Sequence, residues 1–296
     1  MNTTTHSPAL HASGLTKKFG DLTAVDHVDL TVHRGEIVAL LGHNGAGKTT
    51  LLDMALGFAV PEAGAIEVFG KHPSVAAAAG DIGAVLQERG LLKDLTVAET
   101  ARMIADCHHH PRNVDEVLER AGATDFADRK VGKCSGGQVQ RLRFALSLLT
   151  DPDLLILDEP TAGLDATARR EFWRTMHSEA AHGRTIIFAT HYLHEADEFA
   201  ERVVLMDRGS IISDGRLSDL VADRGRTITG TWTSEQDPRT FAAETVSVDG
   251  DTVSFVTHDA DSLTCELLSK RLIRDITIAR PGLEEIFFGL NDAAKE

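Results

Sequence analysis

The sequence predicts an α/β fold with a mixed sheet, followed by a small α+β domain. Two uniformly apolar runs, 154–157 and 186–189, have the length of strands in a parallel sheet that is covered on both faces. A third apolar run, 37–41, leads through a glycine-rich turn into a helical pattern. After about residue 223 the predicted elements follow the order βαββαβ, which is typical of a ferredoxin-like domain.

The N-terminal region is predicted to contain short strands. Residues 1–9 resemble a loose tail, and the alternation of apolar and polar residues over 24–32 predicts a strand that ends at the turn Arg34-Gly35. Beyond the glycine-rich turn and its helix, residues 65–69 and 81–87 predict two more strands. The larger domain therefore begins near residue 10, and we expect it to extend to about 222.

Residues 88–150 are rich in helical patterns and are predicted to form a helical subdomain. Apolar residues recur at helical spacing over 96–108 and 114–121, and Thr96 with Glu99 has the spacing of a capping box. A further helix is expected to begin at Ser135 and to end at about Leu149. Strands 154–157 and 186–189 then return the chain to the sheet.

The last part of the chain, 223–296, is predicted to be a separate accessory domain. Its Asp249-Gly250 pair lies between two alternating runs and predicts a hairpin. The expected elements in chain order are a strand at 226–233, a short helix within 234–243, strands at 244–248 and 252–257, a helix at 259–270, a strand at 273–279 and an amphipathic helix at 281–290.

Composition limits the function classes. The chain has 296 residues, of which 42% are hydrophobic and 25% charged, so a packed core is expected rather than disorder. Its net charge of −15 argues against a general nucleic-acid binder, which needs a basic face. The widely spaced cysteines Cys107, Cys134 and Cys265 suggest no disulfide framework and fit a reducing compartment.

No apolar run approaches the ~20 residues that a membrane-spanning helix needs. The polar first ten residues lack the pattern of a signal peptide. We therefore expect a cytoplasmic protein. If it acts at a membrane, another chain must supply the spanning part.

The run from Gly42 to Thr50 is the strongest functional signal. A glycine-rich turn between a strand and a helix lets several backbone N–H groups point at one anion, and the helix N-terminus adds partial positive charge. Lys48 is placed to reach the outer phosphates of a nucleotide, and the Thr49 hydroxyl is placed to hold Mg²⁺. The predicted nucleotide-binding residues of this run are Gly42, His43, Asn44, Gly45, Ala46, Gly47, Lys48, Thr49 and Thr50.

Polar residues follow the apolar strands. Asp158 is a candidate ligand of Mg²⁺, and Glu159 is a candidate base for the water that attacks the γ-phosphate, although two acids after a strand also suit an exposed turn. His191 follows the strand 186–189 and is placed to steady that water. Gln87 ends the strand 81–87 and is a candidate ligand of Mg²⁺ or the water.

Three further features have two interpretations each. The run Ser135, Gly136, Gly137, Gln138 at a helix start suits a second anion site or an ordinary helix cap. Phe19 suits either stacking on a base or the core. The histidines 108–110 precede a proline and suit a solvated helix end better than a metal site.

Taken in order, these residues resemble the ATP-binding subunit of ABC transporters, a P-loop NTPase fold. The resemblance covers about residues 10–215. In that comparison residues 42–50 match the Walker A motif, Gln87 the Q-loop, residues 134–138 the signature motif, residues 154–159 the Walker B motif, Asp165 the D-loop and His191 the switch histidine. Cys134 and His43 depart from the residues usual at those positions, and Phe19 replaces the commoner adenine-stacking tyrosine.

The resemblance implies a mechanism. Two copies dimerise head to tail, and each ATP is held by the Walker A run of one copy and by Ser135 and Gly137 of the other. Mg²⁺ accompanies ATP and is held by Thr49, Gln87 and Asp158. Hydrolysis by Glu159 opens the dimer and moves a separate multi-span permease, on which the subunit lies at the inner face of the cell membrane.

The segments 191–203 and 281–290 resemble one subgroup, the ATPases of multidrug, antibiotic or Na⁺ exporters. Other functions are an importer's ATPase, a soluble ABC protein that acts on ribosomes or DNA, and a regulatory binding module. Importers often carry a β-barrel-like tail, and the soluble proteins usually have two cassettes or a long coiled coil. Intact Glu159 and His191 argue against a module that only binds.

Overall fold

The computed structural model describes residues 7–86, 90–216, 219 and 225–279. The chain divides into two compact units, Met1–Asp214 and Gly215–Glu296. Within the described residues, no helix is both long enough and apolar enough to cross a membrane. Ala9, which the sequence assigned to a loose tail, is fully buried and its N–H donates to the Val32 carbonyl at 2.8 Å, so this residue belongs to the folded unit.

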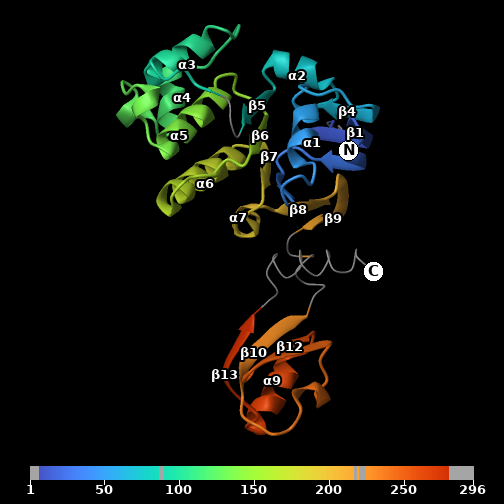
Figure 1. Ribbon diagram of the computed structural model, residues 1–296. Coiled ribbons are helices and arrows are strands. Elements are labelled where there is room, and N and C mark those ends of the chain that lie inside the picture. Colours follow the sequence, from blue (N-terminus) through green and yellow to red (C-terminus); the bar gives the residue numbers. More distant parts are fainter. Residues whose placement is uncertain (1–6, 87–89, 217–218, 220–224, 280–296) are drawn as a thin grey trace, which may run out of the picture. The chain divides into compact units, whose positions relative to one another are not determined.

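The first unit is built on a six-stranded sheet in the order β5-β6-β7-β3-β8-β9 (Figure 1). From β5 to β8 neighbouring strands are parallel. Their bounds are β3 Ile37–Leu41, β5 Ile82–Val85, β6 Leu154–Asp158, β7 Thr185–Thr190, β8 Arg202–Asp207 and β9 Ser210–Arg216. Because Leu41 pairs with Thr190 and Asp158 with Ala189, the carboxyl ends of β3, β6 and β7 meet at one edge of the sheet.

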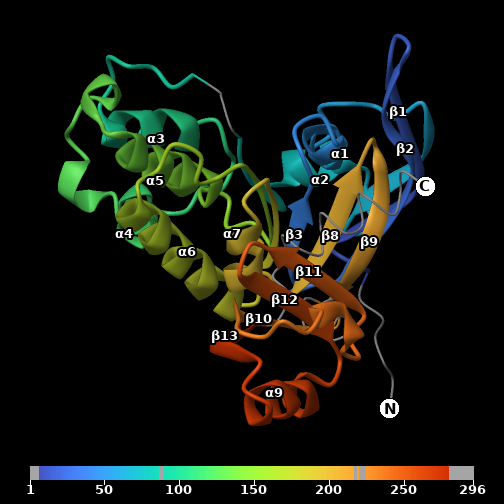
Figure 2. The same ribbon diagram turned by 60° about the horizontal axis from the view of Figure 1, so that its bottom comes forward.

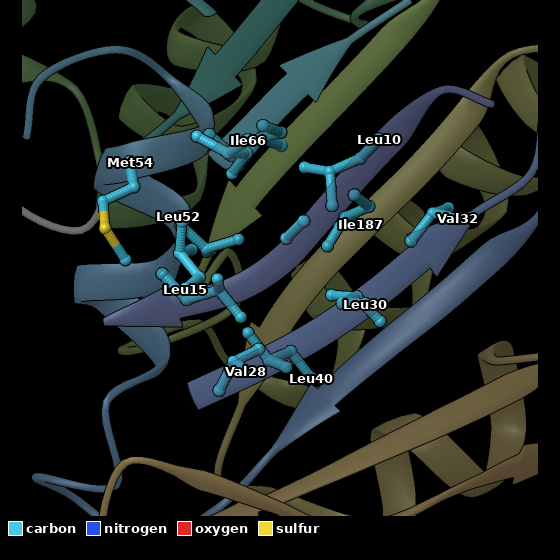
Figure 3. Close-up of a cluster of buried hydrophobic side chains, with 14 of the residues drawn as sticks. Leu10, Leu15, Val28, Leu30, Val32, Leu40, Leu52, Met54, Ile66 and Ile187 are labelled. Atoms are coloured by element: carbon cyan, nitrogen blue, oxygen red, sulfur yellow. The ribbon is translucent and has the colours of Figure 1, made fainter. Parts of the chain in front are cut away.

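A second, antiparallel sheet covers one side of this unit. Its strand order is β2-β1-β4, with bounds β1 Leu10–Phe19, β2 Leu22–Val32 and β4 Ala63–Val68. Figure 3 shows the apolar contact between the two sheets: Leu15 and Val28 point toward Leu40, and Leu10 lies near Ile187. Helices α1 Lys48–Ala55 and α2 Pro73–Ala79 belong to the same unit, and Leu52 and Met54 of α1 join this core.

Helices α3 Val97–Ala105, α4 Val114–Arg120 and α5 Gly136–Ser147 lie together at the side of the unit away from β1 and β2 (Figures 1 and 2). The predicted capping box is confirmed, because Thr96 Oγ1 accepts from Glu99 N at 3.1 Å and Glu99 Oε2 accepts from Thr96 N at 2.8 Å. Helix α3 ends at Ala105, earlier than the predicted 108. Short 3₁₀ turns, Thr124–Phe126 and Val131–Lys133, connect α4 to α5.

Helices α6 Ala166–Ala181 and α7 Leu193–Phe199 complete the first unit. Neither was assigned from the sequence, and strands β8 and β9 and helix α2 were also missed. Strands β8 and β9 are joined by Arg208-Gly209, whose φ values of 47° and 86° are those of a tight hairpin turn. The buried face of α6 is aromatic: the Trp173 ring stacks on Phe199 of α7 with centroids 4.5 Å apart.

The second unit is a four-stranded antiparallel sheet in the order β11-β12-β10-β13. Its elements are β10 Arg226–Trp232, a 3₁₀ turn Pro238–Thr240, β11 Thr245–Asp249, β12 Thr252–Thr257, α9 Ala260–Ser269 and β13 Ile273–Ala279. The predicted hairpin turns at Gly250, whose φ is 58°. The strands and α9 agree with the predicted ranges to within one or two residues.

The short helix predicted within 234–243 is present only as the three-residue 3₁₀ helix Pro238–Thr240. Side chains satisfy the backbone of this segment locally: Ser234 Oγ accepts from Gln236 N at 3.1 Å, and Asp237 Oδ1 accepts from Arg239 N at 3.0 Å. The Asp237 contact is the N-cap of this 3₁₀ helix, and the Ser234 contact lies just before it. The position of the first helix in the predicted βαββαβ order is thus taken by a 3₁₀ helix and not by an α-helix, and the helix predicted at 281–290 lies outside the described residues.

Candidate active site

The glycine-rich run forms the turn between β3 and α1. Gly45 and Gly47 have φ values of 86° and 102°, which L side chains rarely adopt. A Cβ at Gly47 would also lie 2.3 Å from the Ala24 carbonyl oxygen of β2. The turn therefore curls against β2 because Gly47 has no side chain, and α1 begins directly after it.

Replacement of Gly47 by alanine is expected to destabilise this turn. The left-handed backbone and the contact with the Ala24 carbonyl should together cost at least 1–3 kcal/mol, as an order of magnitude for a strained backbone, and should weaken nucleotide binding. Urea unfolding and titration with a fluorescent ATP analogue measure the two effects. The matched control is Gly35→Ala, because Gly35 has a φ of 79° but a Cβ there would meet no described atom within 4 Å. Equal stability and affinity of both variants would contradict the account.

Lys48 is almost fully buried inside the turn. Its Nζ donates to the carbonyl oxygens of Gly42 at 2.6 Å and His43 at 3.1 Å. Burial lowers the pKa of Lys48, while the carboxylates of Glu159 and Asp158 act in the opposite direction. The ammonium group is thus held at the turn by carbonyl oxygens, where it can meet an anion.

Thr49, the second residue of α1, contacts the end of β6. Its hydroxyl donates to Asp158 Oδ2 at 3.0 Å. Burial raises the pKa of Asp158, against the opposing effects of the Thr49 hydrogen bond and the Lys48 charge. The two side chains offer a hydroxyl and a carboxylate oxygen, which are the ligand types that Mg²⁺ prefers.

Glu159 and His191 form a direct pair across the ends of β6 and β7. His191 Nδ1 lies 2.9 Å from both carboxylate oxygens of Glu159. The Glu159 backbone has a φ of 48°, and its N–H donates to the Ala189 carbonyl at 2.9 Å. The carboxylate is buried while the histidine is more than a third exposed, so the pair lies at the edge of a pocket. An acid held in this way can orient or deprotonate a water.

Lys48, Thr49, Glu159 and His191 line one pocket of about 310 Å³, and Asp158 lies behind Thr49, outside that lining. Phe19, 56% exposed, lies at its rim with the Lys17 ammonium 5.3 Å from the ring centroid, so the core interpretation of Phe19 is wrong. Its full lining is Phe19, Leu22, Ala24, Asn44, Gly45, Ala46, Gly47, Lys48, Thr49, Thr50, Glu159 and His191. Sequence reasoning missed Leu22 and Ala24. The register offers a signal for them, because Leu22 pairs with Phe19 and Ala24 is on the same face of β2.

His43 has a different position. Its Nε2 lies 2.7 Å from Asp207 Oδ1 at the end of β8, and its Nδ1 lies 2.7 Å from the Asn44 carbonyl. Gly42 is tightly enclosed, because a Cβ there would lie 2.5 Å from the Met206 carbonyl. These two residues therefore join the turn to β8, and their carbonyls hold Lys48.

The predicted second anion site lines a separate pocket at the start of α5. Ser135 caps this helix: its Oγ accepts from Gln138 N at 3.3 Å, and Gln138 Oε1 accepts from Ser135 N at 3.0 Å. The pocket is lined by Ser135, Gly136, Gly137 and Gln138 together with Asp165, which caps α6 by accepting from Ala168 N at 2.8 Å. The helix-cap interpretation is thus confirmed, and an anion site at the same N–H groups stays a prediction.

Two of the sequence candidates remain, Gln87 and the histidines 108–110. Gln87 lies outside the described residues. The histidines 108–110 follow the end of α3 and are exposed. Within the described part of the chain, no group of three or more His, Cys, Asp or Glu side chains could hold a metal ion. Burial raises the pKa of the Cys134 thiol, whose Sγ lies 3.5 Å from the Lys130 carbonyl.

Comparison with known proteins agrees with this geometry. The family described as "ABC transporter" matches residues 25–162. Daunorubicin resistance ATP-binding protein DrrA3 of Streptomyces coeruleorubidus is 38% identical, over 73% of this chain and 71% of that protein. Nod factor export ATP-binding protein I of Ralstonia nicotianae is 35% identical, over 94% of this chain and 89% of that protein. The chain belongs to the ATP-binding proteins of ABC transporters.

Solved structures of this family share the fold. A cbiO1 subunit from Clostridium perfringens, part of an ABC transporter complex, is 28% identical with a TM-score of 0.66, over 73% of this chain and 92% of that one. An ATP-binding cassette in a dimeric post-hydrolysis state, bound to ADP and Pi, is 25% identical with a TM-score of 0.64, over 70% and 98% of the two chains. This chain is therefore an ABC ATPase that binds and hydrolyses ATP.

Proposed function

We propose that this chain is the ATPase subunit of an exporter, and that it powers the export of a drug-like, antibiotic or other small compound through a separate membrane permease. The observation that carries the catalytic part is the Glu159–His191 pair, 2.9 Å apart, in the same pocket as Lys48 and Thr49. The hydrolysis of a nucleoside triphosphate needs a phosphate-binding turn, a positive charge such as the Lys48 ammonium, and a carboxylate such as Glu159 that is held in place.

In this mechanism, the N–H groups of the turn and Lys48 bind the phosphates of ATP. Glu159 accepts a proton from the attacking water at its carboxylate, and His191 holds that carboxylate in place through Nδ1. Phe19 offers its exposed ring to the adenine base. Phe19 ends β1, Lys48 begins α1, and Glu159 and His191 directly follow β6 and β7, so each side chain is held next to a helix or strand.

Mg²⁺ suits the pair formed by Thr49 and Asp158. Such a site needs only one or two protein oxygens, because Mg²⁺ keeps several waters and takes further ligands from the phosphates. When bound, Mg²⁺ neutralises charge on the phosphates. Gln87 is the third ligand that we expect.

The pocket lined by Ser135 at the start of α5, called the Ser135 pocket from here on, is then the second half of an ATP site. The first half of that site, with Lys48, lies on another copy of the chain. Ser135, Gly136 and Gly137 offer a hydroxyl and N–H groups at the start of α5, yet they line a different pocket from Lys48. Two copies arranged head to tail would each close the other's nucleotide pocket, and Asp165 would lie at that interface. The similar cassette bound to ADP and Pi is a dimer in its post-hydrolysis state, which supports this arrangement.

The direction of transport is supported by the relatives. Those named above are a daunorubicin resistance protein and a Nod factor export protein, and a further relative is a "Probable multidrug ABC transporter ATP-binding protein". These names favour export over import and over a soluble role at ribosomes or DNA. The subunit would then work in the cytoplasm, at the inner face of the membrane, attached to its permease.

Transport should depend on both the ATPase and a permease. Co-expression of this chain with a multi-span permease that co-purifies with it should reduce daunorubicin accumulation in a drug-sensitive bacterial host. The same pair carrying Glu159→Gln should not, because the ATPase step is lost. Equal accumulation with the two pairs, across a panel of exported antibiotics, would count against an exporter, and co-purification of the chain with ribosomes instead of the permease would count against transport.

A further inference from the structure

Glu195 is a fully buried carboxylate beside the catalytic pair. It lies in the first turn of α7, four positions after His191, and its side chain is inaccessible to solvent. A buried carboxylate is costly unless it is paired and hydrogen-bonded. Glu195 therefore has to be explained by the groups that it contacts.

Three groups meet its two oxygens. The Thr161 hydroxyl donates to Oε1, and the Thr190 hydroxyl donates to Oε2 at 3.0 Å. The Arg169 Nε lies 3.4 Å from Oε1 and supplies the opposite charge. Thr161 and Thr190 are themselves buried, so each oxygen has a fixed partner and neither is satisfied by bulk solvent.

Two of these contacts connect Glu195 to the segments that carry Glu159 and His191. Thr161 lies two residues after Glu159, in the loop after β6, and that loop turns back on itself because Ala162 N donates to the Glu159 carbonyl at 3.1 Å. Thr190 directly precedes His191 and also accepts from Tyr192 N at 3.0 Å. One carboxylate thus fixes the loop that carries Glu159 against the loop that carries His191.

The third contact, between Arg169 and Glu195, involves the helix that borders the Ser135 pocket. Arg169 is in the first turn of α6, next to Ala168, and Ala168 lies so near Gly137 that a Cβ added there would be 3.1 Å from the Ala168 Cβ. The same turn is capped by Asp165. The start of α6 therefore touches Glu195 through Arg169 and the Ser135 pocket through Ala168.

We propose that Glu195 is a positioning residue for ATP hydrolysis: it sets the Glu159–His191 contact through Thr161 and Thr190, and it links that contact to the start of α6 beside the Ser135 pocket. This inference rests on the roles proposed above for Glu159 and His191. Glu195 lies outside the lining of the nucleotide pocket, so it acts on the rate of hydrolysis and not on the affinity for ATP.

Steady-state ATPase kinetics of the full-length Glu195→Gln variant test the proposal. The amide has the same shape but cannot offer two acceptor oxygens or balance Arg169. We expect kcat to fall by about ten- to a hundredfold, because a small misplacement of a catalytic group has an effect of that order. KM for ATP and nucleotide affinity should change little. Glu198→Gln, an exposed acid on the same helix, is the matched control and should keep its full kcat.

Variants of Thr161 provide a test that does not need the buried charge to be changed. Thr161→Val should lower kcat in the same way, whereas Thr161→Ser keeps the hydroxyl and should restore most of it. Combining Thr161→Val with Glu195→Gln should cost no more than the more damaging single variant, because both break one contact. If Glu195→Gln fails to fold, the Thr161 series alone decides.

Other outcomes would overturn the proposal. These are an unchanged kcat of Glu195→Gln or of Thr161→Val, a parallel loss of ATP affinity, or a Thr161→Ser variant as impaired as Thr161→Val. Glu159→Gln and His191→Ala are measured in the same assay. If they lose turnover while the Glu195 and Thr161 variants keep it, only the role of Glu195 fails. If they turn over normally, the catalytic roles fail as well.

Discussion

Glu159→Gln is expected to bind ATP as the natural chain does and to lose almost all turnover. The amide keeps the size of the side chain and an oxygen that can accept from His191 Nδ1, so the strained backbone at residue 159 and the 2.9 Å contact can persist. It cannot take a proton from water. General-base catalysis is worth about 10²–10⁴-fold, and kcat should fall by that order.

Two measurements check this result: ATPase turnover and the affinity for ATP. Glu201→Gln, an exposed acid just before β8, is the control for the loss of one negative charge. If Glu159→Gln turned over at the normal rate, another group would be the base. If it lost ATP affinity instead, Glu159 would have a role in binding.

Ser135→Asp is expected to abolish turnover while it keeps the helix that it caps. Aspartate is as good an N-cap as serine, and its negative charge at a helix N-terminus is favourable. A helix cap alone therefore predicts a stable and active variant. An anion site predicts the opposite, because the carboxylate would face the phosphates of ATP held by the other copy.

The expected loss in kcat is on the order of 10²-fold, as for the removal of one anion-stabilising donor. Ser135→Asn is the matched control, since it caps the helix without a charge. ATP affinity of the isolated subunit should be the same in all three proteins, because Ser135 and Lys48 line different pockets. If Ser135→Asp turned over ATP at the normal rate, Ser135 would be a helix cap and not part of an anion site.

Local patterns made the phosphate-binding turn predictable. Its glycines, Lys48 and Thr49 lie within one short run between a strand and a helix, and the positive φ values of Gly45 and Gly47 are the reason that glycine is needed there. Asp158, Glu159 and His191 were predicted as separate strand-end residues. Their contacts depend on the strand order β6-β7-β3, which the apolar runs did not predict, although they did predict parallel strands.

What the sequence did not predict depends on distant packing. Glu195 in a polar helical segment has the pattern of a surface acid, and only the approach of Thr161 and Arg169 from other elements buries it. Leu22 and Ala24 line the pocket because β2 folds over the turn. In the second unit the reason is local: the helix expected within 234–243 is limited to the 3₁₀ helix Pro238–Thr240, which Asp237 caps.

The central claim is that one ATP joins two half-sites on two copies of this chain. The most direct test is the mass of the Glu159→Gln subunit in solution, by light scattering, with and without saturating ATP and Mg²⁺. The account predicts a monomer without nucleotide, a dimer with it, and a monomer again when Ser135→Asp is added to the ATP-bound variant. A dimer that persists with Ser135→Asp, or a Glu159→Gln subunit that stays monomeric with ATP bound, would contradict the claim.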